Sequence, residues 1–303
     1  MKKLKVVVSL ITQANDYQRC QASAAEDSAK RHGIDVQVIY ANNSAVDQSQ
    51  QLLEAIQSKS NRPDAIVVEP VGTGMLRVAQ AAAAAGIGWA VLNRDVEYIY
   101  ELRKTSTMPV FLVGADQEAV GQIQGRQFCA LLPASGCILY IEGPSTGGVA
   151  PLRTAGMVAT KLTSIDIKTL KGDWTAESAY KAVNSWRRLS TAKHLHIGVI
   201  GCQNDAMAAG ARKAFEEVTD NLERSQWLSL PYTGCDGLPE TGQEWVRRGV
   251  LAATVITPPS AGIAVDLLVK AIHSGAHVPE RTMAAPCSYP SIEDLTRKFQ
   301  RRV

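Results

Sequence analysis

Several features that mark other protein classes are missing from this 303-residue chain. Its formal net charge is only +3 and its aromatic content is 6%, so nothing indicates a surface that follows the phosphates of a nucleic acid. No apolar run approaches the roughly 20 residues that a membrane-spanning helix needs, so direct membrane insertion is not expected. The remaining composition, 46% hydrophobic and 20% charged, is ordinary for a globular protein, and the length allows two domains.

Cysteine pairs at the C-x-x-C spacing of metal and redox sites are also absent. The six cysteines are scattered through a chain long enough to need no disulfide staples, so we interpret them as mostly reduced core residues. This usage favours a reducing compartment. The six are Cys20, Cys129, Cys137, Cys202, Cys235 and Cys287.

The sequence does not indicate a bound metal or cofactor. His194 and His196 alternate on a strand edge, but no further metal ligands are evident near them, and a structural role is expected. The glycine-rich turn at 143–148 lacks the Lys-Ser/Thr pair of a P-loop. We therefore predict neither a metal site nor a cofactor.

An export signal is not visible either. The apolar stretch from Val6 to Ile11 is shorter than a signal peptide requires, and polar residues from Gln13 to Asp16 follow at once. We interpret the stretch as a first strand. The protein is then either not exported or has lost its export segment.

The chain does contain a regular alternation of short apolar runs and helical patterns, repeated at roughly 25–30 residues. This order predicts an α/β fold with parallel sheets and right-handed crossovers. Ser44, Asp116 and Thr175 are expected to cap helices, and Val46 is expected inside the helix after Ser44. Strands are predicted at 5–10, 36–40, 65–69, 89–92, 110–114, 137–141, 165–170, 196–202, 227–234 and 252–256. Helices are predicted at 16–32, 73–85, 149–160, 238–248 and 259–274, and after each of the caps.

The alternation forms two successive sets of elements, joined by a polar stretch at 96–109 that we expect to be irregular. Each set is long enough for one sheet of about five to six strands. If the last long helix and the segment 284–288 cross back between the sets, a hinge joins them rather than a flexible linker. We predict one domain from residues 1–114 plus 258–284, and a second from residues 115–257 plus 285–303.

Polar residues follow almost every predicted strand. The strand that starts at His196 ends abruptly in Gln203, Asn204 and Asp205, and a helical pattern begins there. In an open parallel sheet, ligands bind outside the carboxyl ends of the strands. Arg, Asp and Asn make strong paired hydrogen bonds with adjacent hydroxyls, and the flat faces of Tyr and Trp suit the C–H side of a sugar ring. The candidate ligand-binding residues are Asn15, Tyr17, Asn93, Arg94, Arg153, Trp174, Asn204, Asp236 and Thr257.

Five stretches carry a family resemblance, in the same order along nearly the whole chain. They are Asn-Arg at 93–94, Arg-Thr-Ala-Gly-Met at 153–157, Gln-Asn-Asp-Ala-Met-Ala-Ala-Gly at 203–210, Gly-Cys-Asp-Gly at 234–237 and Leu-Ala-Ala-Thr-Val at 251–255. The chain resembles the ribose/galactose-type periplasmic sugar-binding proteins, whose ligand domain is shared with LacI-type repressors. The resemblance implies a type 1 periplasmic binding fold: two doubly wound, Rossmann-like parallel-sheet domains joined by a three-crossover hinge that closes on a monosaccharide.

The resemblance also implies roles for individual residues. Arg94 and Arg153 would donate hydrogen bonds to hydroxyls and to the ring oxygen of the sugar. Asn204 and Asp236, which lie in the other domain, would bind further hydroxyls of the sugar. No catalytic residue is implied.

Two aromatic residues, Tyr17 and Trp174, would sandwich the sugar ring according to the same resemblance. Three positions depart from the family pattern. Asn93 stands where relatives often have Asp, Cys235 where they often have an aromatic residue, and Thr257 where they often have Gln. The identity of the sugar therefore stays open.

Each of these assignments has a purely structural alternative. Asn204 is a good helix N-cap, although Asp205 could cap instead. Asp236 suits a turn, and Trp174 could be a hydrophobic staple on the helix that follows it. Tyr17 could belong to the core of its helix, and the two arginines could form surface ion pairs.

We interpret the chain as a non-enzymatic protein that binds a small sugar or polyol in a cleft between two lobes, with hinge closure. It would act as a transport receptor or as a sensor, with an ABC transporter permease or a signalling protein as partner. No helix-turn-helix precedes the first strand, so DNA binding is not expected. The resemblance implies a periplasmic location, whereas the chain as given fits the cytoplasm.

An alternative function is that of an α/β-hydrolase. Residues 143–147, Gly-Pro-Ser-Thr-Gly, match the G-x-S-x-G pattern of a nucleophile elbow, with Ser145 as the nucleophile. Either Asp236 or Asp266 and then either His273 or His277 follow in the chain order of that class. The doubled α/β alternation fits a hydrolase poorly.

Overall fold

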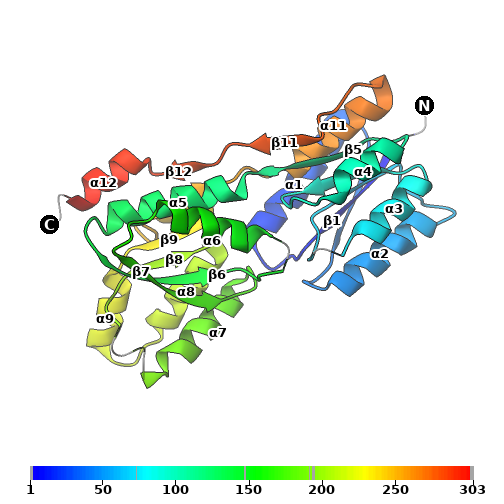
Figure 1. Ribbon diagram of the computed structural model, residues 1–303. Helices are drawn as coiled ribbons and strands as arrows, with labels where there is room; N and C mark the ends of the chain where they lie inside the picture. The colour runs from blue at the N-terminus through cyan, green and yellow to red at the C-terminus, as the bar shows by residue number, and fades with distance from the viewer. Residues whose placement is uncertain (1–2, 73, 147, 191, 193–194, 301–303) are drawn as a thin grey trace. The chain divides into compact units, whose positions relative to one another are not determined.

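The computed structural model describes residues 3–72, 74–146, 148–190, 192 and 195–300 (Figure 1). Thr73, Gly147 and His194, which enter the sequence predictions above, lie outside these ranges. The chain divides by its internal contacts into two compact units. The first comprises Met1–Ala115, Thr146–Gly148 and Pro259–Ala284, and the second comprises Asp116–Ser145, Val149–Pro258 and Ala285–Val303.

The first unit is built on a six-stranded sheet in the order β11-β5-β4-β3-β1-β2. Every neighbouring pair of its strands is parallel. The strands are β1 (Lys5–Leu10), β2 (Asp35–Tyr40), β3 (Ala65–Val68), β4 (Gly88–Leu92), β5 (Val110–Ala115) and β11 (Arg281–Ala284). The helices are α1 (Asp16–His32), α2 (Ala45–Gln57), α3 (Leu76–Ala84), α4 (Tyr98–Thr105) and α11 (Ala261–Ser274).

Side chains alternate between the two faces of this sheet, and both faces are apolar. Val6 and Val8 of β1 pack in the cluster that includes α1 and α11, whereas Val7 packs in the cluster that includes α2, α3 and α4. A parallel sheet covered on both faces requires such continuous apolar strands. The helices therefore lie on two sides and cover the central strands of the sheet.

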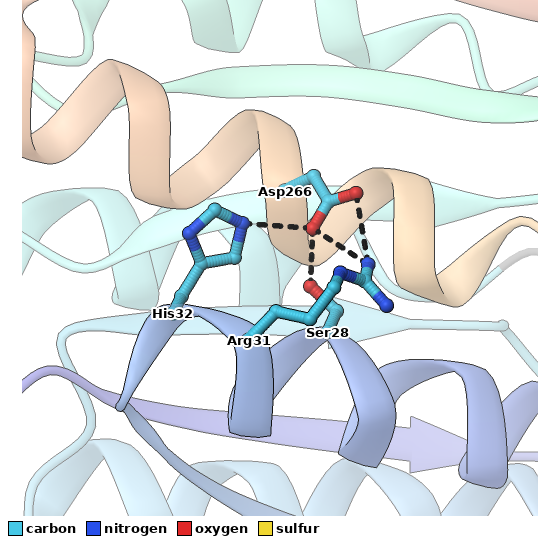
Figure 2. A network of polar contacts seen from close by, with 4 residues as sticks. All are labelled: Ser28, Arg31, His32 and Asp266. Carbon is cyan, nitrogen blue, oxygen red and sulfur yellow. Dashed lines mark hydrogen bonds and ion pairs between the residues drawn. The ribbon is translucent and has the colours of Figure 1, made fainter.

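Helices α1 and α11 are joined by a polar network (Figure 2). Asp266 of α11 accepts hydrogen bonds from Ser28 and Arg31 of α1, and His32 Nε2 lies 2.9 Å from Asp266 Oδ1. Burial by itself raises the pKa of Asp266, but the contacts with Ser28, His32 and Arg31 outweigh it, so the pKa lies below its ordinary value. The network is therefore strongest when the carboxylate is ionised.

The second unit is built on a six-stranded sheet in the order β12-β10-β9-β8-β6-β7, in which only β12 is antiparallel to its neighbour. The strands are β6 (Gly136–Glu142), β7 (Ile165–Lys171), β8 (Ile197–Cys202), β9 (Tyr232–Asp236), β10 (Ala253–Ile256) and β12 (Cys287–Tyr289). The helices are α5 (Gln117–Leu131), α6 (Val149–Thr160), α7 (Ala176–Arg187), α8 (Asp205–Glu216), α9 (Asn221–Ser229), α10 (Gly242–Arg247) and α12 (Ile292–Gln300).

Helices α5 and α6 approach each other closely in the second unit because glycine lies at their contact. A Cβ atom on Gly121 of α5 would stand 2.0 Å from the carbonyl oxygen of Arg153 in α6. No side chain fits in that distance, so Gly121 fixes how close the α6 backbone comes. This contact sets the position of Arg153, one of the candidate ligand-binding residues.

Two predictions of local structure are wrong. The stretch 96–109 is not irregular, since it contains α4, whose Ile99 and Leu102 are buried at the i, i+3 spacing of a helix face. Trp227 does not begin a strand but lies in α9, a helix capped by Asp220, whose side chain accepts a hydrogen bond from Glu223 N at 2.7 Å.

The expected core position of Val46 is also wrong. Val46 is 75% exposed, because the buried stripe of α2 runs through Gln48, Leu52 and Ile56 at i, i+4 and i+8. The caps, in contrast, are confirmed: Ser44, Asp116 and Thr175 each accept a hydrogen bond from the backbone N–H three residues on.

Candidate functional site

The candidate residues of the first unit follow β1 and β4, and the structure brings two of them into contact. The Asn93 side chain, after β4, donates to the hydroxyl of Tyr17, in the first turn of α1, at 3.2 Å. Asn15 precedes that helix and caps it, because its Oδ1 accepts from Gln18 N at 2.9 Å. All three are buried. Tyr17 therefore meets a polar partner through its hydroxyl and is not only a core residue.

Two residues that the sequence did not single out hold this pair in place. Ser260 donates to Asn93 Oδ1 at 3.3 Å, and Gln21 Nε2 donates to both Ser260 Oγ at 3.2 Å and the Tyr17 hydroxyl at 3.3 Å. Gln21 also accepts from Ala261 N at 2.8 Å. The signal available in the sequence was a glutamine among the alanines of α1. Gln21 is fully buried in the structure, and buried polar groups need hydrogen-bond partners.

Arg94 belongs to the same edge of the first sheet. Its side chain is buried, at 4% exposure of the residue, so it is not an arginine of the outer surface. Its Nη1 atom lies 3.3 Å from the carbonyl oxygen of Thr146. A guanidinium group carries five N–H donors and no acceptor, which suits a ligand rich in oxygen atoms.

In the second unit, the segment Gln203–Asp205 at the end of β8 connects three neighbouring turns. Gln203 Oε1 accepts from Gly143 N at 3.0 Å, and its Nε2 donates to Ala150 O and to Thr154 Oγ1, both at 3.0 Å. Gln203 thereby ties the turn after β6 to the start of α6.

Asn204, the next residue, caps α8: its Oδ1 accepts from Met207 N at 2.9 Å, and its Nδ2 donates to Trp174 O at 3.0 Å. Asn204 is therefore the N-cap of α8, as its structural alternative predicts. The idea that Asp205 could cap this helix instead is wrong. Asp205 accepts from Gly237 N at 2.8 Å and from Thr254 Oγ1 at 2.7 Å. Its carboxylate holds the turn after β9, where Asp236 lies.

Arg153 and Trp174 also meet in the second unit. Arg153 Nε donates to Gln117 Oε1 at 2.9 Å, and its Nη1 donates to the Gln203 carbonyl. The guanidinium carbon lies 5.6 Å from the centroid of the Trp174 ring, within the range of a cation–π contact. The ring lies against the backbone of Gly143, where an added Cβ would stand 2.2 Å from it.

Three candidate residues have backbone conformations that L-residues rarely adopt. The φ angles are 57° at Asn93, 73° at Trp174 and 111° at Asp236. Asn tolerates the left-handed region, whereas Trp and Asp at these angles cost roughly 1–3 kcal/mol each. Strain of this kind concentrates at ligand-binding sites, where the surrounding contacts enforce it.

Thr257 completes the candidate set. Its backbone N–H donates to the Asp236 carbonyl at 3.0 Å, so the turns after β9 and β10 are adjacent. The Thr257 hydroxyl is buried and has no hydrogen-bond partner within the described ranges. Buried hydroxyls are rarely left so, and a ligand oxygen is one way to satisfy this one.

The hydrolase alternative centred on Ser145 finds no support in the hydrogen bonds of the described residues. Ser145 is exposed, and no hydrogen bond joins it to an imidazole among the described residues. Asp266 directs its carboxylate at Ser28, Arg31 and His32 of α1. Across the part of the chain that the structure covers, no group of three or more His, Cys, Asp or Glu residues could hold a metal ion. No described helix has the length and apolar character needed to cross a bilayer.

The nine candidate residues therefore divide into two sets, and each residue lies between the end of a strand and the first turns of the helix that follows it. Asn15, Tyr17, Asn93 and Arg94 belong to the first unit, and Arg153, Trp174, Asn204, Asp236 and Thr257 to the second. A family model described as a periplasmic binding protein domain matches residues 6–275. The chain belongs to this family. The predicted resemblance is confirmed, and the family is one of solute-binding proteins, which fits a role without catalysis.

Known proteins of this family resemble the chain over most of its length. The xylitol-binding protein of Mycolicibacterium smegmatis is 28% identical over 248 residues, which are 80% of this chain and 66% of that protein, so the chain spans about two thirds of its length. A periplasmic solute-binding protein of an ABC transporter from Actinobacillus succinogenes, solved with D-allose, superposes with a TM-score of 0.80 at 21% identity, covering 97% of this chain and 100% of the other.

A second solved structure is the fructose-binding periplasmic domain of a hybrid two-component system. It superposes with a TM-score of 0.78 at 20% identity and covers 99% of this chain and 95% of the other. At these identities the structures establish the fold. The predicted two-lobed, doubly wound type 1 fold is confirmed.

Proposed function

We propose that this protein binds a small sugar or polyol at the carboxyl edges of its two sheets, and that one ligand bridges the two sets of residues. The observation that carries the proposal is that oriented donors, acceptors and aromatic faces gather at the same edge in each unit. In the first unit Tyr17 and Asn93 are already paired, and in the second Trp174 is braced by Gly143 and Arg153. A polyhydroxylated ligand loses its water on entry, so each hydroxyl needs such a partner.

The known relatives support this ligand class. One is described as binding xylitol, and the solved structures carry D-allose in one case and are described as fructose-binding in the other. These are acyclic and cyclic polyhydroxyl compounds of similar size. The partner of this chain would be an ABC transporter permease or a signalling protein, the two settings in which those structures occur.

Binding would work by domain closure. A ligand that touches both units gains all of its contacts only in the closed state, so it shifts the population towards that state. The expected observation is a smaller radius of gyration by small-angle X-ray scattering when a binding sugar is added. An unchanged radius at saturation would contradict closure.

The site is tested by isothermal titration against xylitol, D-allose, fructose and related polyols. Arg94→Ala and Asp236→Ala should each cost about 1.5–3 kcal/mol of binding free energy, which is at least about a tenfold rise in Kd. Arg62→Ala is the matched control, because this exposed arginine precedes β3 and lies at the opposite end of the first sheet. Wild-type affinity in both site variants would refute the assignment. Labelling of Ser145 by a serine-reactive fluorophosphonate would instead favour catalysis.

A further inference from the structure

A cavity lies at the amino-terminal end of the second sheet, at the opposite end of β8 from the candidate ligand-binding residue Asn204. The end of α7, the segment that leads into β8, and α9 form its walls, and its volume is about 710 Å³. Cavities that hold small molecules usually measure about 300–1,000 Å³. Ile197, the first residue of β8, lines the cavity, whereas Asn204 follows the last residue of the strand, so roughly 20 Å separate the two places.

The aromatic part of the cavity wall is held in a fixed orientation. Trp227 of α9 stacks on the buried ring of Phe215, with the ring centroids 4.5 Å apart and an angle of 23° between the planes. It also meets the buried ring of Trp186 edge to face, at a centroid distance of 5.9 Å. The indole Nε1 donates to Glu223 Oε1 at 3.1 Å. Further apolar surface comes from Ala192, Leu195, Ile197 and Leu230.

Arg187, the last residue of α7, brings a positive charge to this wall. Its Nη1 atom donates to Asn184 Oδ1 at 3.2 Å and to Ala214 O at 3.0 Å. Its Nε atom is buried and has no hydrogen-bond partner among the residues that the structure describes. Within the same part of the chain, Nη2 has no acceptor and no carboxylate pairs with the guanidinium.

Another half-buried arginine of the second unit shows the ordinary arrangement. The side chain of Arg212 in α8 is 22% exposed, and its Nε lies 3.2 Å from Glu216 Oε1, one helical turn away. Charged side chains that leave the surface are normally paired in this way. Arg187 therefore retains donors that an acceptor from outside the chain can use.

The donors that Arg187 retains share one edge of its guanidinium group. The Nε–H and one N–H of Nη2 point in the same direction along that edge, and their spacing matches the two oxygens of a carboxylate. The protein itself uses Nη1, which lies on another edge. The edge that pairs with a carboxylate through two parallel hydrogen bonds is thus the one without an acceptor.

We propose that this cavity is a second binding site, which takes a small organic carboxylate with an aromatic or aliphatic body. The carboxylate pairs with Nε and Nη2 of Arg187, and the body lies against Trp227 and the apolar wall. Glu223 also lines the cavity, but it is exposed and bonded to Trp227 Nε1, so solvent weakens its repulsion of an anion. A sugar has no charge for Arg187 and little apolar surface for this wall.

The test is isothermal titration with phenylacetate and with its neutral isostere phenylacetamide. Phenylacetate should bind wild type, and it should bind Arg187→Gln at least about tenfold more weakly, because the variant lacks the charge and the paired donors. Arg188→Gln is the matched control, since Arg188 is the exposed next residue and does not line the cavity. It should bind phenylacetate within about twofold of wild type. Equal affinity of wild type and folded Arg187→Gln would overturn the proposal.

The amide separates recognition of the carboxylate from simple stacking on the indole. Phenylacetamide should bind wild type at least about tenfold more weakly than phenylacetate, and equal binding of the two would overturn the proposal. So would the absence of phenylacetate binding at about 5 mM, where a site with a Kd near 1 mM is mostly filled. Should Arg187→Gln not fold, Arg187→Lys keeps the charge without the paired donors and should still bind at least about threefold more weakly.

Fluorescence shows where the probe binds. Phenylacetate should change the tryptophan fluorescence of wild type, and Trp227→Phe should lose most of this change while keeping an aromatic wall. A change that persists in full in Trp227→Phe would place the probe elsewhere and overturn the proposal. The proposal does not depend on sugar binding, so the failure of either one leaves the other standing.

Discussion

Replacement of Asp205 tests the most consequential contact in the second unit. The carboxylate is 3% exposed and accepts from Gly237 N at 2.8 Å and Thr254 Oγ1 at 2.7 Å. Hydrogen bonds to a charged group contribute about 1.5–3 kcal/mol each. In Asp205→Ala the two donors stay buried without this partner. We expect the free energy of unfolding to fall by about 3–5 kcal/mol.

Asp205→Asn is the matched variant, because it keeps the shape and changes only the charge and one acceptor. The amide oxygen can still accept from Gly237, and its NH2 group can donate to the Thr254 hydroxyl, which rotates to accept. The expected loss is therefore smaller, about 1–2 kcal/mol. The loss in Asp205→Asn measures the charge and the changed acceptor, whereas the further loss in Asp205→Ala measures the remaining contacts together with the lost volume.

The measurement is urea unfolding followed by far-UV circular dichroism, with the free energy taken from midpoint and slope. The Asp205→Asn protein should also show weaker sugar binding, since the turn that carries Asp236 loses an anchor. An Asp205→Ala protein within about 0.5 kcal/mol of wild type would refute the reasoning. So would an Asp205→Asn protein as unstable as the alanine variant.

Three further predictions concern other parts of the chain. Gly143→Ala should displace the Trp174 ring, seen as a change in tryptophan fluorescence, and weaken sugar binding at least about tenfold; unchanged spectra would contradict this. Because the pKa of Asp266 is lower in the folded state, its contribution is present above the unfolded pKa and lost as pH falls through the folded one. Asp266→Asn should thus lose less stability than wild type between about pH 6 and about pH 3, measured by urea midpoints. Burial raises the pKa of the Cys235 thiol to about 12, so a maleimide at about pH 8 should label exposed Cys287 promptly and Cys235 only on unfolding.

Much of the fold could be predicted because its signals are local. The strands are short apolar runs, and the caps at Ser44, Asp116 and Thr175 are single residues that bond to a backbone group three positions away. Helix α4 escaped prediction because its apolar face is narrow within a polar stretch. Helix α9 escaped because Trp227 and the residues after it are apolar enough for a strand, although Asp220 caps a helix there.

The candidate site could be predicted only in part. Strand ends are visible in the sequence, so residues just beyond them can be named. The contact between Asp205 and Gly237 joins residues 32 positions apart, and the left-handed backbone of Trp174 depends on its surroundings. The sequence predicts Glu69 only as the last residue of a strand. Its burial and its hydrogen bond to Gln18 could not be predicted, because both exist only in the folded protein.

The three side chains of Gln203, Asn204 and Asp205 have a consequence for anyone who wishes to redirect this protein to another small molecule. Each of them makes at least one hydrogen bond to a different loop of its own lobe. A library randomised at Gln203 and Asp205 would return misassembled lobes rather than new specificities. By the same logic, a search that uses the tripeptide as a fingerprint collects proteins that share a way of joining loops, whatever compound each of them holds.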